Sequence, residues 1–228
     1  MKINYIALAT FLTVGGFAYG APVAPCSAGN TLTTYLAAGY ECEISDKIYS
    51  NFSYTDPAGD PTSDQIVVGV DNQPGILQTG LQFQTTGSTW TVGGFAIGYS
   101  IAVDPSVCDT FALNGTSGNI CAITAAQLSF QGALAPNSAA MNAILTPGGT
   151  ISVNDLATAN NTAQISLGGQ PLTATNVVIN GLDASSSAPI DSFGLDVYQT
   201  ISSVPEPASL GFVGMGLIGL GLFGRRLS

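Results

Sequence analysis

The sequence contains no histidine and only four basic residues among 228. Without an imidazole, the chain cannot form a Ser-His-Asp or Cys-His catalytic arrangement, nor a zinc site that uses histidine ligands. A mechanism that needs carboxylates alone, as in glycoside hydrolysis, stays open. Because the commonest general base is missing, we predict that the chain is not an enzyme.

Basic residues are almost absent from the middle of the chain. Lys2, Arg225 and Arg226 lie in the terminal segments, so Lys47 is the only cation between about residues 21 and 203. Thirteen carboxylates in the same region give it a net charge of about −12. Such a body cannot neutralise phosphates, which argues strongly against nucleic-acid binding and phosphoryl transfer.

The N-terminal segment MKINYIALATFLTVGGFAYG has the features of an export signal. One basic residue, Lys2, precedes an apolar run from Ile3 to Phe17, and the small residues Ala18 and Gly20 follow. Small residues three before and one before the cut favour cleavage after Gly20. A transmembrane anchor is the alternative, which the shortness of the run disfavours. We therefore predict a signal peptide over residues 1–20.

Export would place the four cysteines in an oxidising compartment, where they can form disulfides. Four cysteines allow three pairings. Local pairing of Cys26 with Cys42 and of Cys108 with Cys121 would close two short loops, each worth about 3 kcal/mol. The C-x-x-C spacing of a metal site is absent. We favour two structural disulfides over free or metal-bound thiols.

The body of the chain alternates short β-branched or aromatic runs with turn residues. This pattern predicts an all-β sandwich, jelly-roll or Ig-like, over residues 21–200. In 47–55 the alternation places Ile48, Ser50, Phe52 and Tyr54 on one face. One short helical turn is expected over 32–38, ended by Gly39. The expected strands are 47–55, 64–70, 76–85, 88–103, 122–135 (with a short helix as alternative), 149–158, 162–170, 173–181 and 190–200.

The C-terminal end combines a proline motif, an apolar run and two arginines. Pro205 and Pro207 hold Val204-Pro205-Glu206-Pro207 extended. The 17 residues 208–224 are at the short end for a single transmembrane helix, and Arg225-Arg226 would stay in the cytoplasm. These features suit either a permanent anchor or a segment that a processing enzyme recognises.

The stretch VPEPASLGFVGMGLIGLGLFGRR closely resembles the PEP-CTERM sorting signal of exopolysaccharide-producing Gram-negative bacteria. The resemblance implies that Val204, Pro205, Glu206 and Pro207 are the recognised motif and Arg225 and Arg226 the positive stop, within a signal over 201–228. It further implies cleavage by an exosortase in the inner membrane, a transient location for this chain. The mature protein would then pass to the cell surface or extracellular matrix.

The N-terminal part of the body also resembles a recurrent class of PEP-CTERM cargo. The similarity is carried by Pro25-Cys26, Tyr35-Leu36, Cys42 and the run 45–54, SDKIYSNFSY. In that class a cysteine pair precedes a similar strand and a β-sandwich body. The resemblance therefore supports the fold and the Cys26–Cys42 pairing, and it implies no activity and no cofactor.

Acidic residues offer the only candidate metal site. Asp56, Asp60 and Asp64 recur every four residues in DPAGDPTSD and could bind calcium, which prefers oxygen ligands. The spacing of an EF-hand loop is absent, and Asp and Pro are ordinary turn formers. We therefore favour a solvated loop without a metal.

Two further candidates concern carbohydrate. Asp191 and Asp196 could act as a carboxylate pair, and Trp90 could stack on a sugar, although a single tryptophan in an alternating strand is more often part of the core. We expect a non-catalytic exported protein of the surface or biofilm matrix, associated with exopolysaccharide. The rival hypothesis is a carbohydrate-binding module or a carboxylate-only glycosidase.

Overall fold

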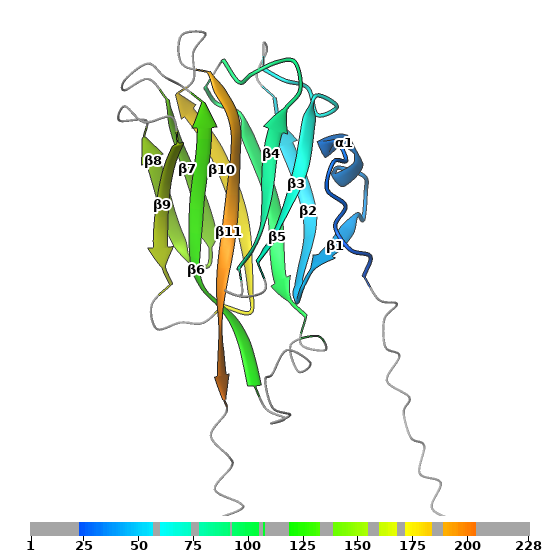
Figure 1. Ribbon diagram of the computed structural model, residues 1–228, viewed down its shortest axis with the longest axis vertical. Helices are drawn as coiled ribbons and strands as arrows, with labels where there is room; N and C mark the ends of the chain where they lie inside the picture. The colour runs from blue at the N-terminus through cyan, green and yellow to red at the C-terminus, as the bar shows by residue number, and fades with distance from the viewer. Residues whose placement is uncertain are drawn as a thin grey trace, which may run out of the picture.

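Two antiparallel sheets pack face to face in the computed structural model of the chain (Figure 1). The predicted all-β sandwich is confirmed. The structure describes residues 23–56, 60–73, 78–91, 93–104, 107, 119–132, 139–154, 160–167, 172–183 and 189–203. The predicted signal peptide (1–20) and the segment from residue 204 onward lie outside these ranges. Among the described residues, no helix is long and apolar enough to cross a membrane.

The six-stranded sheet has the order β1-β2-β5-β10-β7-β8 and the five-stranded sheet the order β3-β4-β11-β6-β9. Every pairing between neighbouring strands is antiparallel. The six-stranded sheet contains β1 (Glu41–Ile44), β2 (Lys47–Thr55), β5 (Ala96–Val103), β7 (Ala140–Thr146), β8 (Gly149–Asn154) and β10 (Ala174–Asp183). The five-stranded sheet contains β3 (Ile66–Gln73), β4 (Gln78–Thr85), β6 (Asn119–Gly132), β9 (Asn160–Ser166) and β11 (Ile190–Ser203).

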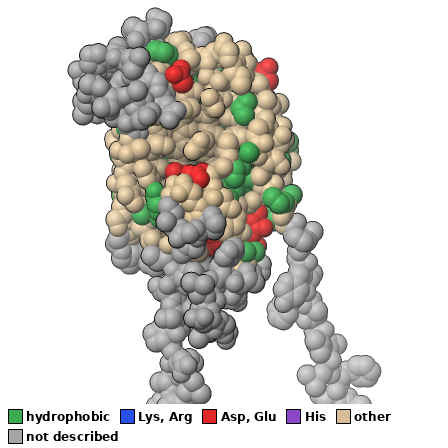
Figure 2. All heavy atoms as spheres, viewed as in Figure 1, with side chains coloured by type: hydrophobic (Ala, Val, Ile, Leu, Met, Phe, Trp, Pro, Cys, Tyr) green, Lys and Arg blue, Asp and Glu red, His purple; other side chains and the backbone are tan. Residues whose placement is uncertain are grey.

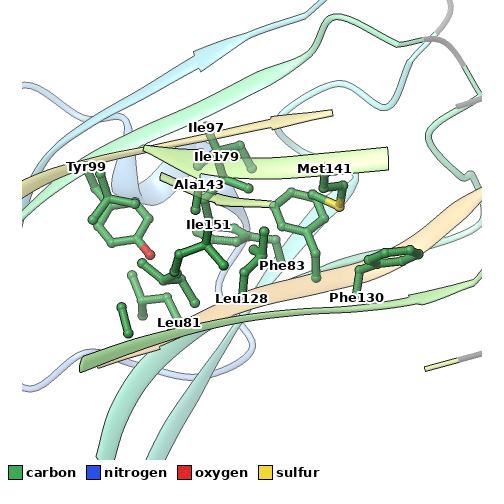
Figure 3. Close-up of a cluster of buried hydrophobic side chains, with 14 of the residues drawn as sticks. Leu81, Phe83, Ile97, Tyr99, Leu128, Phe130, Met141, Ala143, Ile151 and Ile179 are labelled. Atoms are coloured by element: carbon green, nitrogen blue, oxygen red, sulfur yellow. The ribbon is translucent and has the colours of Figure 1, made fainter. Parts of the chain in front are cut away.

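A single apolar core fills the space between the sheets. Successive side chains of a strand point to opposite faces, so alternate apolar residues all reach the interior. Leu81 and Phe83 extend from β4 toward Ile97 and Ile179 of the other sheet, as Figure 3 shows, and all four are fully buried. Removing this apolar surface from water is the main force that holds the two sheets together.

Strand β2 departs from the alternation that its sequence suggests. A bulge at Asn51, which has a φ of 55°, shifts the pairing with β5 between Ser50 and Ser53. Asparagine tolerates this left-handed conformation better than most residues. Tyr49 therefore points inward before the bulge and Phe52 after it, and both rings contact Tyr99. The expectation that Ile48, Ser50, Phe52 and Tyr54 share one face is wrong, because a bulge inserts one residue.

Other strands differ from the sequence-based expectation at their limits. The expected strand 88–103 is interrupted by a turn at Gly94, which has a φ of 101°, so β5 begins only at Ala96. Of the expected strand 122–135, residues 122–132 are strand and not helix, since they belong to β6, and residues 133–135 lie outside the described ranges. The sequence does not predict strands β1 and β7. Strand β1 has only four residues, and the sequence AMNAILT of β7 lacks a clear alternation of apolar and polar residues.

The N-terminal segment before β1 is attached to the sandwich by a disulfide. Helix α1 (Leu32–Tyr35) lies within the expected helical turn but is shorter than expected. It ends with Leu36 as its C-cap, so Gly39, which has a φ of 73°, lies beyond the helix and does not end it. Cys26 and Cys42 form a disulfide with a Cα–Cα distance of 4.7 Å, as the resemblance implied. The proposed partners Cys108 and Cys121 have side chains outside the described part of the chain.

Candidate functional site

The outer face of the five-stranded sheet is built mostly from amide, hydroxyl, carboxylate and glycine residues. Antiparallel register brings the outward residues of the five strands into rows across this face. We call it the polar face; its described members are Val67, Gly69, Asp71, Gln73, Gln78, Gly80, Gln82, Gln84, Ala125, Gln127, Ser129, Thr162, Gln164, Ser166, Ser192, Gly194, Asp196 and Tyr198. Figure 2 shows this side of the molecule, on which most described side chains are neither apolar nor charged.

The described surface offers no cation to a ligand. Lys47 is the only basic residue among the described residues, and its side chain is 1% exposed. Its ammonium group lies in the interior, 2.7 Å from an oxygen of Asp46, and also donates a hydrogen bond to Gln199. Burial lowers the pKa of Lys47, while Asp46 acts in the opposite direction. An anionic ligand would therefore find no basic partner on the described surface.

Two carboxylates meet in one row of the polar face. Asp71 of β3 and Asp196 of β11 both pair with Gly80, which lies on the strand between them. Because Gly80 has no side chain, the Asp196 carboxylate occupies the space above it. A Cβ atom on Gly80 would lie 2.0 Å from Asp196 Oδ1. Burial raises the pKa of Asp196 to about 6, Asp71 adds to this effect, and a hydrogen bond from Gln78 opposes it.

A shallow polar depression adjoins the end of the polar face where β4 finishes. Its volume is about 500 Å³, and its lining residues are Gln84, Thr85, Gly87, Ser88, Thr89 and Asp191. The Asp191 side chain is exposed. The hydroxyl oxygen of Ser88 is buried and has no hydrogen-bond partner. Every side chain in the lining is hydroxyl, amide or carboxylate, which suits a hydroxyl-rich ligand better than an apolar one.

The acidic repeat expected to bind calcium is not arranged around one point. Asp60 is buried, and its Oδ1 atom accepts a hydrogen bond of 3.0 Å from the backbone N–H of Thr91. Asp64 accepts one of 2.5 Å from the Thr62 hydroxyl, whereas Asp56 is exposed. No group of three or more His, Cys, Asp or Glu side chains within the described ranges could hold a metal ion.

Asp196 has a different neighbour from the one suggested by the sequence. The suggested partner, Asp191, lies beside an irregularity of β11 between Ile190 and Ser192 and lines the depression. Asp71, which the sequence analysis did not single out, shares the row of Asp196. No local signal marks this pairing, because it depends on the register of three strands that are far apart in sequence.

Trp90 does not offer a platform to a sugar. It is fully buried, and its ring centroid lies 5.2 Å from that of Phe95 and 4.9 Å from that of Phe193. The preference for a core role is confirmed. The polar face carries the aromatic ring of Tyr198, which is partly exposed and donates a hydrogen bond to Gln127.

The C-terminal segment was compared with models of known protein families. Residues 203–226 match the model described as the PEP-CTERM protein-sorting motif. The chain carries a PEP-CTERM sorting motif. The matched range includes Val204-Pro205-Glu206-Pro207 and Arg225-Arg226, which lie outside the described residues. A PEP-CTERM motif implies secretion, with processing by an exosortase during transit through the membrane.

Three solved structures show a distant similarity to this chain, each with a TM-score of 0.29. A CBM35 module from Cellvibrio japonicus Abf62 is 12% identical, with 80% of this chain and 97% of that chain covered. TmCBM61, in complex with β-1,4-galactotriose, is 8% identical, with coverages of 68% and 90%. Xyl-CBM35, in complex with a disaccharide containing glucuronic acid, is 11% identical, with coverages of 76% and 97%.

Because these TM-scores and identities are so low, the similarities assign no ligand to this chain. A comparison with curated proteins gave no match. The evidence on function is therefore the sorting motif together with the residues of the polar face.

Proposed function

We propose that this chain is a non-catalytic, exported protein of the cell surface or extracellular matrix of a Gram-negative bacterium, where it associates with exopolysaccharide. Residues 1–20 direct export, residues 21–200 form the working sandwich, and residues 201–228 are the sorting signal with its transmembrane helix. The observation that supports this most directly is the PEP-CTERM motif at residues 203–226. It implies an exosortase as a transient partner and the inner membrane as a transient location.

The sorting step is tested by the mass of the mature protein. The full chain is produced in a host with an exosortase and in the same host without it. With the enzyme, the mature chain should lack Arg225 and Arg226. Without it, or after Glu206→Ala, the intact C-terminus should remain with the membrane fraction. Glu41→Ala, which alters an exposed glutamate of β1, is the matched control and should be processed normally. A mature chain that keeps both arginines in the presence of the exosortase contradicts the proposal.

Association with exopolysaccharide is supported by the chemistry of the polar face. Side-chain amides donate and accept hydrogen bonds at once, as sugar hydroxyls do, so the two can pair without leaving groups unsatisfied. The described surface presents carboxylates and no exposed cation, which favours an uncharged polysaccharide over an anionic one. The proposed binding surface is therefore the outer side of β4 around Gln82 and Gln84, of which Gln84 also lines the 500 Å³ depression.

Binding is tested by co-sedimentation of the chain with purified exopolysaccharide of the producing strain. Replacing Gln82 and Gln84 with alanine should weaken the association, because both side chains are exposed on the polar face. The control replaces Thr150 and Ser152 with alanine, since both are exposed on β8 in the other sheet. Equal loss in both double variants, or no binding by the wild-type chain, argues against the proposed surface. Release of reducing sugar would instead identify an enzyme.

A further inference from the structure

An amine, a carboxyl group and a carboxamide meet in the interior of the sandwich, at Lys47, Asp46 and Gln199. The exposed fractions of these residues are 1%, 3% and 8%. The Lys47 ammonium group lies 2.7 Å from Asp46 Oδ1 and donates a hydrogen bond to Gln199 Oε1. Asp46 Oδ2 is also buried and has no hydrogen-bond partner. A nucleophile, a proton acceptor and a carbonyl group therefore share one contact point that is shielded from solvent.

Lys47 and Gln199 occupy inward positions on strands of opposite sheets. In β11 the buried residues Leu195 and Val197 precede Gln199 at alternate positions, and in β2 Lys47 lies two residues before the buried Tyr49. Apolar residues fill most such positions in this core. Since replacing a buried ion pair with apolar residues is often neutral or stabilising, packing alone gives no reason for a charged group here.

We propose that Lys47 and Gln199 form an intramolecular amide (isopeptide) bond, with Asp46 as the catalytic residue that moves the protons. A lysine amine becomes a nucleophile when it is desolvated. Gln199 Oε1 is bonded to Cδ, so the nitrogen that contacts this oxygen lies beside the carbonyl carbon that it would attack. A positioned carboxyl group can accept a proton from the amine and deliver one to the leaving group.

The reaction balances with the three side chains alone. The Lys47 ammonium group gives one proton to the Asp46 carboxylate, and the free amine attacks Cδ of Gln199. Burial lowers the pKa of Lys47 and so favours this first transfer, although Asp46 acts in the opposite direction. The new Nζ–Cδ bond forms, a second hydrogen of Nζ reaches the amide nitrogen of Gln199 through Asp46, and the Cδ–Nε2 bond breaks with loss of ammonia. The third hydrogen stays on the new amide. A buried ion pair is thereby replaced by a neutral amide and a neutral carboxyl group, which are less costly to keep out of water.

The bond would join β2 to β11, the last strand of the sandwich, between residues 152 positions apart. A crosslink that closes so long a loop restricts the unfolded chain strongly. Unlike the Cys26–Cys42 disulfide, it would survive reductants. A pulling force applied to the two ends of the body would pass through this bond and not through the sheets. The inference concerns the body of the chain and rests on neither the sorting motif nor sugar binding.

The test uses trypsin, which cleaves after lysine and arginine when their charge is free. Lys47 is the only basic residue between Lys2 and Arg225, so it is the only such site in the body. The wild-type full chain, unfolded and with its disulfides reduced, should remain uncut at Lys47. Its intact mass should be lower than that calculated for the same chain by one ammonia molecule. Digestion with chymotrypsin should release a pair of joined peptides, one with Lys47 and the other with Gln199.

Three variants separate the roles of the residues. Gln199→Ala lacks the carbonyl group that is attacked, so its unfolded chain should have the full mass and be cut at Lys47. Asp46→Asn keeps the amine and the carboxamide but should slow bond formation by about a hundredfold or more, measured as the uncut fraction at successive times after synthesis. Asp191→Asn changes an exposed carboxylate elsewhere and should crosslink like the wild type.

The wild-type chain decides the existence of the bond, so a variant that does not fold leaves no gap. Cleavage of the unfolded wild-type chain at Lys47 overturns the proposal, and so does a loss of ammonia with Lys47 still cleavable, since the reaction would then lie elsewhere. Crosslinking of Asp46→Asn at the wild-type rate overturns the role of Asp46. An Asp46→Asn chain with the wild-type circular dichroism spectrum and no crosslink supports that role apart from any effect on folding.

Discussion

Lys47 of β2 donates a hydrogen bond to Gln199 of β11, a residue 152 positions away on the opposite sheet. The same ammonium group contacts Asp46 at 2.7 Å. The lysine is 1% exposed, so its charge is removed from water and depends on these two partners. Lys47, the one basic residue of the described ranges, thus lies inside the sandwich and connects the two sheets.

Replacing Lys47 with methionine should destabilise the chain by about 3–5 kcal/mol, because it leaves the buried Asp46 carboxylate without its cation. Urea unfolding of the full chain measures this change. The double variant Asp46→Asn with Lys47→Met, which removes both charges, should be more stable than Lys47→Met alone. A single variant as stable as the wild type would show that the ion pair contributes nothing to folding.

The free energy of unfolding of the chain should depend on pH through the carboxyl group of Glu43. Burial raises the pKa of Glu43, and Asp104 and Asp46 add to the effect. The folded chain therefore holds this proton more tightly than the unfolded chain, in which the pKa of glutamate is about 4.3. The resulting stabilisation is complete below that pH and is lost as pH rises through the raised pKa of the folded state.

The pH effect is measured by unfolding wild type and Glu43→Gln between about pH 4 and pH 7. Over this range the wild type should lose stability relative to Glu43→Gln, which has no proton to release. Glu41→Gln, at an exposed position of the same strand, should follow the wild-type curve. Parallel curves for wild type and Glu43→Gln would rule out a contribution from this carboxyl.

The disulfide Cys26–Cys42 should account for a large part of the stability of the N-terminal segment. It closes a loop with a sequence separation of 16, and in the chain-entropy model such a crosslink is worth about 3 kcal/mol. Serine at both positions should lower the free energy of unfolding by that amount in non-reducing buffer. The same comparison in strong reductant should show little difference, and a difference that persisted there would have to come from packing of the cysteines.

Gly181 should not tolerate a side chain. A Cβ atom there would lie 2.1 Å from Cε1 of Phe95, a buried ring that stacks against both Trp90 and Phe193. Gly181→Ala should therefore cost about 1–3 kcal/mol in thermal or urea unfolding. Gly69→Ala, whose new atom would lie 3.3 Å from Cβ of Gln82 on the polar face, is the control and should cost less. Equal costs would mean that the Phe95 ring moves aside freely.

Most strands could be predicted from the sequence, because each is a local alternation of apolar and polar residues. The segment 47–55 was predicted with its observed limits, yet its inward residues were assigned incorrectly. A bulge at Asn51 depends on pairing with β5, which lies about fifty positions further along, and local alternation does not report it. The sequence correctly predicts a core position for Trp90, but the strand that it predicts over 88–103 is interrupted at Gly94.

In the candidate site, too, the residue types can be read from the sequence, whereas their neighbours depend on strand pairing. The sequence marks Asp196 as a candidate carboxylate, but its neighbour Asp71 is brought to it by pairing of β3 with β4 and of β4 with β11. Glycine at position 80 looks like any other glycine in the sequence. It acquires a role only when a carboxylate of the adjacent strand lies above it.

By itself, the sequence determined the β-rich class of the body and the PEP-CTERM motif, since both are encoded by residues that are neighbours along the chain. The tertiary structure alone decided that Lys47 reaches Gln199 and that two aspartates share a row across Gly80. Those contacts depend on strand register and sheet packing, which bring together residues that are distant in sequence.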